Sequence, residues 1–202
     1  MMKSKYSEKE KLIFSGVLKL ARAGQSLEKI TAQQIADSAG VGKATIYDYF
    51  SSKDEIIATA ILYFQQIEMY KFKTHIDSLP SFREKVYSVY ETIAYTLENS
   101  ASIFNTSLIF EPPCNILDRA NVSEENREEI LDTFYNLFYE IIETGNKAND
   151  IKIDISKDED KQYMRMVLFG NVSAVKRELA IKQLPKATVF DYAYKMLICS
   201  LN

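Results

Sequence analysis

Residues 31–50, which read TAQQIADSAGVGKATIYDYF, constrain the fold of this chain more than any other segment. Thr31 is a favourable N-cap for a helix, and Gln34, three positions later, completes the spacing of a capping box. Gly40 permits the left-handed backbone that ends a helix in a tight turn. The residues between them that share one helical face are Ile35, Ala36 and Ala39. The segment therefore predicts a short helix followed by a sharp turn.

A second short helix is predicted after this turn. Val41 and Ile46 can pack it against the first helix. The residues left to face outward are Lys43, Ala44, Thr45, Tyr47, Asp48 and Tyr49. A helix that begins with small and hydroxyl-bearing side chains can enter the major groove of DNA, which makes the pair a candidate helix-turn-helix. The simpler alternative is a pair of packed helices that has no nucleic-acid partner.

Helix punctuation continues along the rest of the chain. The capping-box spacing recurs at Ser7–Glu10, Ser52–Glu55, Ser81–Glu84 and Ser156–Glu159, and all four prolines fall between periodic segments. One short stretch, residues 151–155, alternates like a strand, but no second stretch offers it a partner. The sequence therefore predicts an all-α protein of about nine helices, over residues 7–23, 32–39, 43–49, 53–76, 81–99, 101–109, 124–148, 157–184 and 187–200.

Composition restricts the class of protein further. Hydrophobic residues make up 47% of the 202 residues and charged residues 26%, which is typical of a folded globular protein. The sequence contains neither an apolar run of about 18 residues nor a signal-peptide core, so we expect a cytoplasmic protein without membrane contact. Cys114 and Cys199 lie far apart, and the lone His75 ends a predicted helix. These spacings indicate neither a disulfide nor a metal site.

The net charge of −3 is unevenly distributed. Residues 1–55 hold nine basic and seven acidic residues, which gives +2, whereas residues 56–202 hold 16 and 21, which gives −5. A mildly basic head on an acidic body is compatible with DNA binding through one end. Asp48 departs from this trend, since it can repel a phosphate, accept a hydrogen bond from a cytosine amino group, or point aside.

The flanking segments complete a small N-terminal bundle. Ile13 and Val17 offer apolar side chains from the first predicted helix, Gly24 marks its end, and Phe50 should fill the same core. With these flanks the first 60 or so residues resemble the tetracycline-repressor (TetR) family of bacterial transcriptional regulators. The matching stretches are residues 21–24, 30–36, 39–41, 43–47, 49–50 and 52–55.

The resemblance implies a helix-turn-helix DNA-binding domain over residues 1–52 and a helical ligand-binding and dimerisation domain over residues 53–202. Base-edge readers would be Lys43, Ala44 and Thr45, with Gln33 able to reach a base from the preceding helix. Phosphate contacts would come from Thr31, Tyr47, Tyr49 and Lys53. The alternatives are packing of Tyr47 against the bundle and a merely solvated Lys53.

The resemblance also implies a homodimer formed by the last two helices. The apolar stripes predicted to face the second subunit are Met164, Leu168, Val172, Val175 and Leu179, followed by Phe190, Tyr194 and Leu197. Gly170 would allow a neighbouring helix to approach closely. The alternative is that both stripes pack inside one subunit.

Aromatic residues crowd the middle of the chain, which has 13 tyrosines and 11 phenylalanines in total. A largely apolar cavity with a few hydroxyl groups would suit a hydrophobic or aromatic small molecule. The predicted lining residues are Tyr63, Ile67, Tyr90, Tyr95, Phe134 and Phe138. The alternative for each of them is ordinary core packing.

Together these features predict a bacterial transcriptional regulator. We expect a repressor that binds a palindromic DNA operator as a homodimer and is released by a small hydrophobic effector, with the helix from Lys53 to His75 as the relay. The alternative is a helix-turn-helix regulator controlled by a protein partner, without a small-molecule pocket. An enzyme is not expected, because the single histidine is isolated and no phosphate loop, nucleophile motif or cofactor motif is present.

Overall fold

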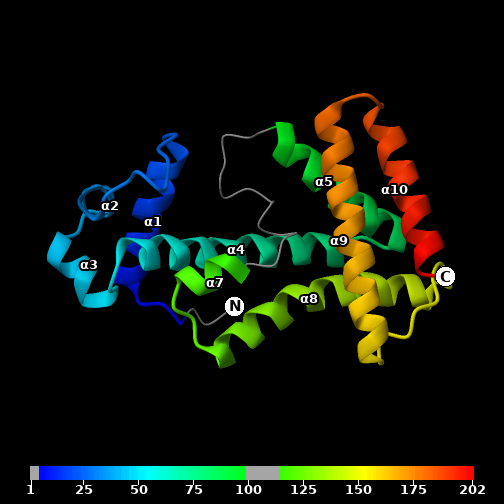
Figure 1. The fold of residues 1–202 in the computed structure, drawn as a ribbon, viewed down its shortest axis with the longest axis horizontal. Coiled ribbons are helices and arrows are strands. Elements are labelled where there is room, and N and C mark those ends of the chain that lie inside the picture. The colour runs from blue at the N-terminus through cyan, green and yellow to red at the C-terminus, as the bar shows by residue number, and fades with distance from the viewer. Residues whose placement is uncertain (1–4, 99–113) are drawn as a thin grey trace. The chain divides into compact units, whose positions relative to one another are not determined.

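The computed structural model describes residues 5–98 and 114–202. The helices in these residues are α1 (Glu8–Arg22), α2 (Ala32–Ala39), α3 (Lys43–Tyr49), α4 (Lys53–Asp77), α5 (Phe82–Glu98), α7 (Cys114–Arg119), α8 (Glu124–Lys147), α9 (Asp158–Ile181) and α10 (Lys186–Ser200) (Figure 1). The all-α prediction is confirmed. The predicted helix 101–109 lies outside the described residues. α7 is missing from the predicted helices because six residues are too few to show a helical period.

Contacts divide the described residues into two compact units. The first unit holds residues 5–67 and 114–129, and the second holds residues 68–98 and 130–202. α4 and α8 therefore each contribute to both units. The predicted domains, 1–52 and 53–202, are functional assignments and stay a prediction.

The first unit is built on the packing of α1 against α2 and of α2 against α3 (Figure 1). Its core is apolar and nearly free of solvent contact, and Phe50 belongs to it as predicted. Gly16 of α1 lies where α2 crosses, so a side chain there would meet the backbone of α2. The buried members of this core are Ile13, Phe14, Val17, Ala21, Ile30, Ile35, Ala36, Ile46, Phe50, Ile56, Ile57 and Ala60.

The predicted capping boxes mostly form. Both reciprocal bonds are present at Ser7–Glu10, Thr31–Gln34 and Ser81–Glu84. At α4 the Ser52 hydroxyl accepts from the Glu55 amide, but the Glu55 carboxylate accepts from the Ser51 amide instead of closing the box. The box predicted at Ser156 is wrong. Ser156 donates its amide and hydroxyl to Asp154 in a local turn, and α9 begins after it without a side-chain cap.

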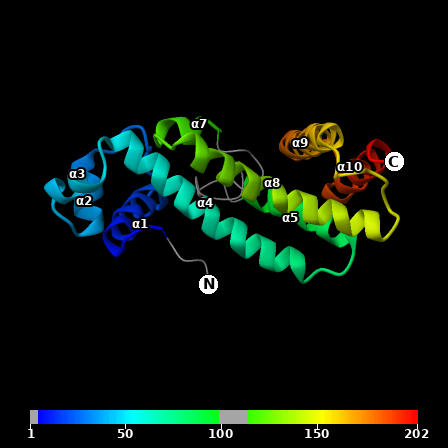
Figure 2. The same ribbon diagram turned by 90° about the horizontal axis from the view of Figure 1, so that it is seen from below.

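The second unit packs α5 against α9 and α10, and α9 and α10 lie side by side in both views (Figures 1 and 2). Its largest buried side chains include Tyr90, Phe82 and Ile142. The alternating stretch 151–155 forms no strand; instead Ile151 and Ile153 insert into this core. The amide of Lys152 donates to the Leu201 carbonyl at 2.9 Å, which ties the stretch to the end of α10.

Candidate nucleic-acid interface

The start of α2 is fixed by a reciprocal pair of bonds between Thr31 and Gln34. The Gln34 amide donates to Thr31 Oγ1 at 3.2 Å, and the Thr31 amide donates to Gln34 Oε1 at 2.8 Å. Thr31 stays exposed at this helix start, where unpaired backbone amides favour an anion. The phosphate contact predicted for Thr31 therefore remains a physically reasonable prediction.

The turn between α2 and α3 depends on Gly40. This residue has φ 70° and ψ 33°, the left-handed conformation that glycine adopts without steric cost. The following amide, that of Val41, donates to the Ala36 carbonyl at 3.0 Å and closes the end of α2. The chain thereby reverses within a few residues and brings Ile46 of α3 into the core, where it has no exposed surface.

α3 buries little else. Ile46 is the buried residue of this helix, while Tyr47 keeps 50% and Tyr49 43% of their surface exposed. Lys43, Ala44 and Asp48 are exposed as well, and Thr45 is half-buried. Five of the residues predicted to contact DNA thus lie on α3 at least partly exposed, and Tyr47 is not in the core; these residues are Lys43, Ala44, Thr45, Tyr47 and Tyr49.

The helix-turn-helix carries little positive charge of its own. Between residues 31 and 50 the charged side chains are Asp37, Lys43 and Asp48. On α2 the Gln33 amide nitrogen donates to Asp37 Oδ1 at 2.8 Å, and both side chains are exposed. Sequence reasoning did not single out Asp37, although its spacing of four residues from Gln33 is a signal for such a pair.

Lys53 has a structural bond that the sequence did not indicate. Its Nζ donates to the Glu28 carbonyl at 2.9 Å, which joins the first turn of α4 to the loop before α2. An ammonium group has three hydrogens, so this bond leaves donors for a phosphate. Lys53 is therefore not simply a solvated lysine, and its contact with DNA stays a prediction.

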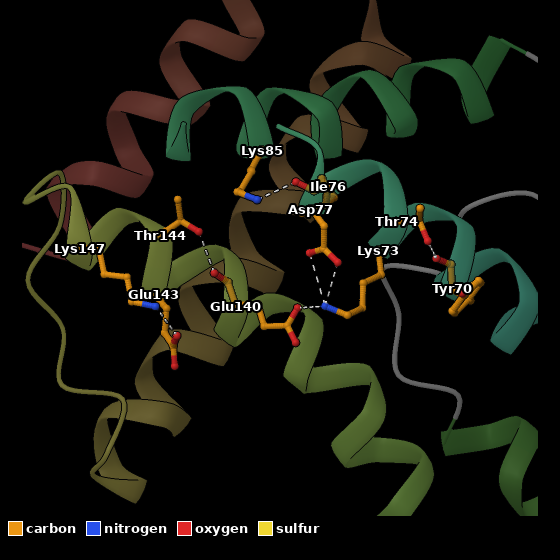
Figure 3. A network of polar contacts seen from close by, with 10 residues as sticks. All are labelled: Tyr70, Lys73, Thr74, Ile76, Asp77, Lys85, Glu140, Glu143, Thr144 and Lys147. Carbon is orange, nitrogen blue, oxygen red and sulfur yellow. Dashed lines mark hydrogen bonds and ion pairs between the residues drawn. The ribbon is translucent and has the colours of Figure 1, made fainter. Parts of the chain in front are cut away.

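In the second unit, the C-terminal half of α4 is held by two lysines (Figure 3). Lys73 of α4 pairs with Glu140 of α8 and with Asp77, which lies 3.3 Å away on its own helix. Lys85 of α5 is buried and donates to the Ile76 carbonyl at 2.6 Å. The end of α4 is thus fastened to both α5 and α8.

A small cavity lies within the second unit. It measures about 20 Å³ and is lined by Val86, Val89, Tyr90, Phe138, Ile141, Leu168, Asn171, Val172 and Leu197. Tyr90 donates its hydroxyl to Asn171 Oδ1 at 2.6 Å, and Asn171 donates to the Ala193 carbonyl at 2.8 Å. Burial raises the pKa of the Tyr90 phenol above its ordinary range. The polar groups at this cavity are therefore bonded to one another, and its surface is apolar.

The structure gathers only some of the predicted pocket residues. Tyr90 and Phe138 line the cavity. Tyr63 packs instead with Tyr6 and Phe14 in the first unit, and Ile67 also belongs to that unit. Tyr95 is 59% exposed, and the side chain of Phe134 lies outside the described residues. Tyr63 does not line this cavity, because helical spacing does not reveal which of two cores a side chain enters, and its role in a ligand pocket stays a prediction.

The residues of the predicted dimer stripes contribute to the core of their own chain. Met164, Val172, Val175, Phe190 and Leu197 are buried there, which favours the alternative for these five, whereas Leu168, Leu179 and Tyr194 are half-buried and their contact with a second subunit stays a prediction. Among the described residues, no atom outside the backbone of α9 itself lies within 4 Å of the position of a Cβ added to Gly170.

Other apolar side chains of α9 and α10 face outward. On α9 Met166 is 75% exposed, and on α10 Tyr192 is 64% exposed. Around them the exposed large apolar residues of this part of the chain are Tyr163, Ile181, Leu184 and Met196. We call these six residues the α9–α10 face.

Two further observations concern metal and membrane contact. In the described ranges no three His, Cys, Asp or Glu side chains come together as a metal site would require. No helix within those ranges has the length and apolar character needed to cross a membrane.

An all-helical chain that presents α3 on a capped helix-turn-helix has the architecture of a DNA-binding regulator. Residues 23–60 match the family described as bacterial regulatory proteins, tetR family. This match covers the helix-turn-helix and its flanks, so this segment is similar to the family that its residues predicted. Comparison with curated protein sequences gives no significant match.

Solved structures of regulators share the whole fold. The fatty acid degradation regulator FadR of Bacillus halodurans is 17% identical, with a TM-score of 0.57 over 96% of this chain and 97% of that one. FadR of Bacillus subtilis, solved in complex with stearoyl-CoA, is 18% identical, with a TM-score of 0.53 over 95% and 97%. A TetR/AcrR regulator of Thermobifida fusca is 18% identical, with a TM-score of 0.59 over 95% and 97%.

Proposed function

We propose that this chain is a homodimeric repressor that binds a palindromic operator and leaves it when a hydrophobic small molecule binds. The observation that carries the proposal is the exposure of α3. This helix buries Ile46 and leaves its polar and aromatic side chains exposed or half-exposed at the surface. A helix so exposed can enter a major groove without unfolding the bundle. The similarity of residues 23–60 to bacterial regulatory proteins of the tetR family supports regulation of transcription, and repression is a further part of the proposal.

DNA binding is tested by selecting binding sequences from a random library and measuring affinity by fluorescence anisotropy over a salt titration. Tyr47→Ala and Lys53→Ala should weaken binding to all sequences and, for Lys53, reduce the dependence on salt by about one released counterion. Tyr70→Ala is the matched control, because Tyr70 is an equally exposed tyrosine on α4. Wild-type affinity in both Tyr47→Ala and Lys53→Ala would refute these contacts.

The α9–α10 face supports the dimer. Apolar side chains as exposed as Met166 and Tyr192 gain free energy when a second surface covers them, at roughly 25 cal/mol per Å². Gly170 lies on α9 with no other helix of the described residues close to it, so a helix of a second subunit has room to approach it. We therefore move the proposed interface from the predicted stripes to this face.

Light scattering during size-exclusion chromatography tests the interface. Tyr192→Glu should shift the protein toward the monomer, because it places a charge in an apolar contact. Tyr70→Glu serves as the control, since it puts the same charge on an exposed position of α4. A monomeric wild-type protein, or a Tyr192→Glu variant as dimeric as the wild type, would contradict the proposed interface.

The apolar cavity supports a hydrophobic effector. Of the nine side chains that line it, eight are aliphatic or aromatic and none is charged. At about 20 Å³ it has room for about one water molecule, so an effector would have to widen it by moving α5, α8 or α9. Lys73 and Lys85 connect two of these helices to α4, which begins beside the helix-turn-helix.

The small size of the cavity is also the observation that favours the alternative, control by a protein partner. Titration of the protein–operator complex with stearoyl-CoA, and with uncharged apolar compounds, separates the two. The effector proposal is supported if a compound releases DNA from the wild type and releases less DNA from Val172→Phe, a variant that fills the cavity. Unchanged DNA affinity across the panel favours the protein partner.

A further inference from the structure

We propose that Asp37 orients Gln33 to read an adenine in the operator, an inference that rests on the proposed DNA binding. Gln33 lies in the first turn of α2 and Asp37 one turn later, so both project from the same face of the helix. The amide nitrogen of Gln33 donates to Asp37 Oδ1 at 2.8 Å. This bond determines which end of the Gln33 amide is free.

The bond leaves the carbonyl oxygen of Gln33 and one amide hydrogen for a partner. Gln34, the other amide of this turn, is not available in the same way, because its Oε1 accepts from the amide and hydroxyl of Thr31. Gln33 is thus the exposed amide of the turn that can contact DNA.

Electrostatics argue against a phosphate as this partner. A phosphate needs hydrogen-bond donors, but the amide nitrogen of Gln33 is turned onto Asp37, whose carboxylate would repel the phosphate. A base edge that offers a donor beside an acceptor fits better. In the major groove, adenine presents its N6 amino group next to the N7 acceptor, and a glutamine amide can bond both.

The assignment also accounts for the unusual charge of this helix-turn-helix. Asp37 and Asp48 outnumber Lys43 between residues 31 and 50, which costs affinity for a polyanion. By orienting Gln33, the Asp37 carboxylate would increase discrimination between bases, which offsets its unfavourable effect on affinity for DNA. Asp37 is therefore a positioning residue, and Gln33 is the residue that touches the base.

The experiment compares operator selection by the wild type, Gln33→Ala, Asp37→Ala and the control Asp48→Ala. The base position whose preference disappears in Gln33→Ala is then synthesised with adenine, with purine, which lacks the N6 amino group, and with 7-deazaadenine, which lacks N7. For the wild type, removal of the amino group should weaken binding about 5- to 150-fold. The ratio of the affinity for the adenine site to the affinity for the purine site should be near unity in Gln33→Ala. It should be clearly reduced in Asp37→Ala and unchanged in Asp48→Ala.

The Asp48→Ala control separates the loss of Gln33 orientation from the loss of one negative charge. Both aspartate variants remove one negative charge from the DNA-facing surface, so both should bind all sequences more tightly, but only Asp37→Ala should lose discrimination at the adenine. Tighter binding by Asp37→Ala with an unchanged purine ratio overturns the proposal, as does any other base at the Gln33 position. If the wild type selects no sequence, the proposed function fails as well. If it selects one that Gln33→Ala reads identically, only the present proposal fails.

Discussion

Gly16 of α1 faces Ala39 of α2 so closely that no side chain fits between them. A Cβ added to Gly16 would lie 2.9 Å from the Ala39 Cβ and 3.0 Å from the Ile35 carbonyl oxygen. Close to this point the Ser38 hydroxyl donates to the Gly16 carbonyl at 3.1 Å. α2, the first helix of the helix-turn-helix, therefore packs directly on the backbone of α1.

Gly16→Ala should destabilise the first unit by about 1–3 kcal/mol, because α1 and α2 must separate to accept the methyl group. Ser15→Ala is the control on the neighbouring position of α1, which is only half-buried. Urea denaturation measures the free energy of unfolding of both variants. Operator affinity should fall in Gly16→Ala, together with stability, and should not fall in Ser15→Ala. A Gly16→Ala variant more stable than the wild type would show that helix propensity outweighs this contact.

The Tyr90–Asn171 bond between α5 and α9 should be cooperative. Tyr90→Phe and Asn171→Leu each leave a buried polar partner unsatisfied, so each should lower the free energy of unfolding by about 1–3 kcal/mol. The double variant should cost less than the sum, since the two losses share one bond. Strict additivity in a double-mutant cycle measured by denaturation would contradict the coupling.

The two lysines that hold α4 should differ in importance. Lys85→Ala should cost about 1.5–3 kcal/mol, because it removes a buried ammonium that bonds the Ile76 carbonyl. Glu140→Gln should cost about 0.2–1 kcal/mol, because the pair of Lys73 and Glu140 is exposed to solvent. Salt at 1 M screens surface charges beyond about 3 Å. Thermal denaturation should therefore show that added salt reduces the cost of Glu140→Gln and leaves the cost of Lys85→Ala unchanged. The reverse ranking would refute this interpretation.

Tyr6 should make the protein sensitive to alkali. Burial, followed by the nearby Glu10 carboxylate, raises the pKa of the Tyr6 phenol to about 12. In the unfolded chain it ionises near about pH 10, so between these values the unfolded state loses a proton that the folded state keeps. Its contribution to stability is complete below the lower value and is lost as the pH rises through the higher one. Between these two pH values, the free energy of unfolding should fall less steeply with rising pH in Tyr6→Phe than in the wild type or in Tyr70→Phe. Denaturation at a series of pH values measures this slope.

Local chemistry explains what could be predicted from the sequence. The caps at Ser7, Thr31 and Ser81, and the left-handed turn at Gly40, depend on residues within a few positions of one another. Such short-range bonds form wherever the chain runs as a helix, so the sequence alone determined the helices and the helix-turn-helix. The failed box at Ser156 shows the limit, since Asp154 competed for the same hydroxyl.

Only the tertiary structure decided which side of a helix is buried. α9 carries apolar residues on more than one side, so Met164 and Met166 are equivalent in sequence, yet Met164 is fully buried and Met166 is 75% exposed. Tyr63 and Tyr90 likewise enter different cores. The choice depends on which distant helix packs against each side, and this long-range contact free energy is not encoded in the spacing of one helix. The sequence determined that the chain has a helix-turn-helix, and the fold determined which faces of its helices remain exposed.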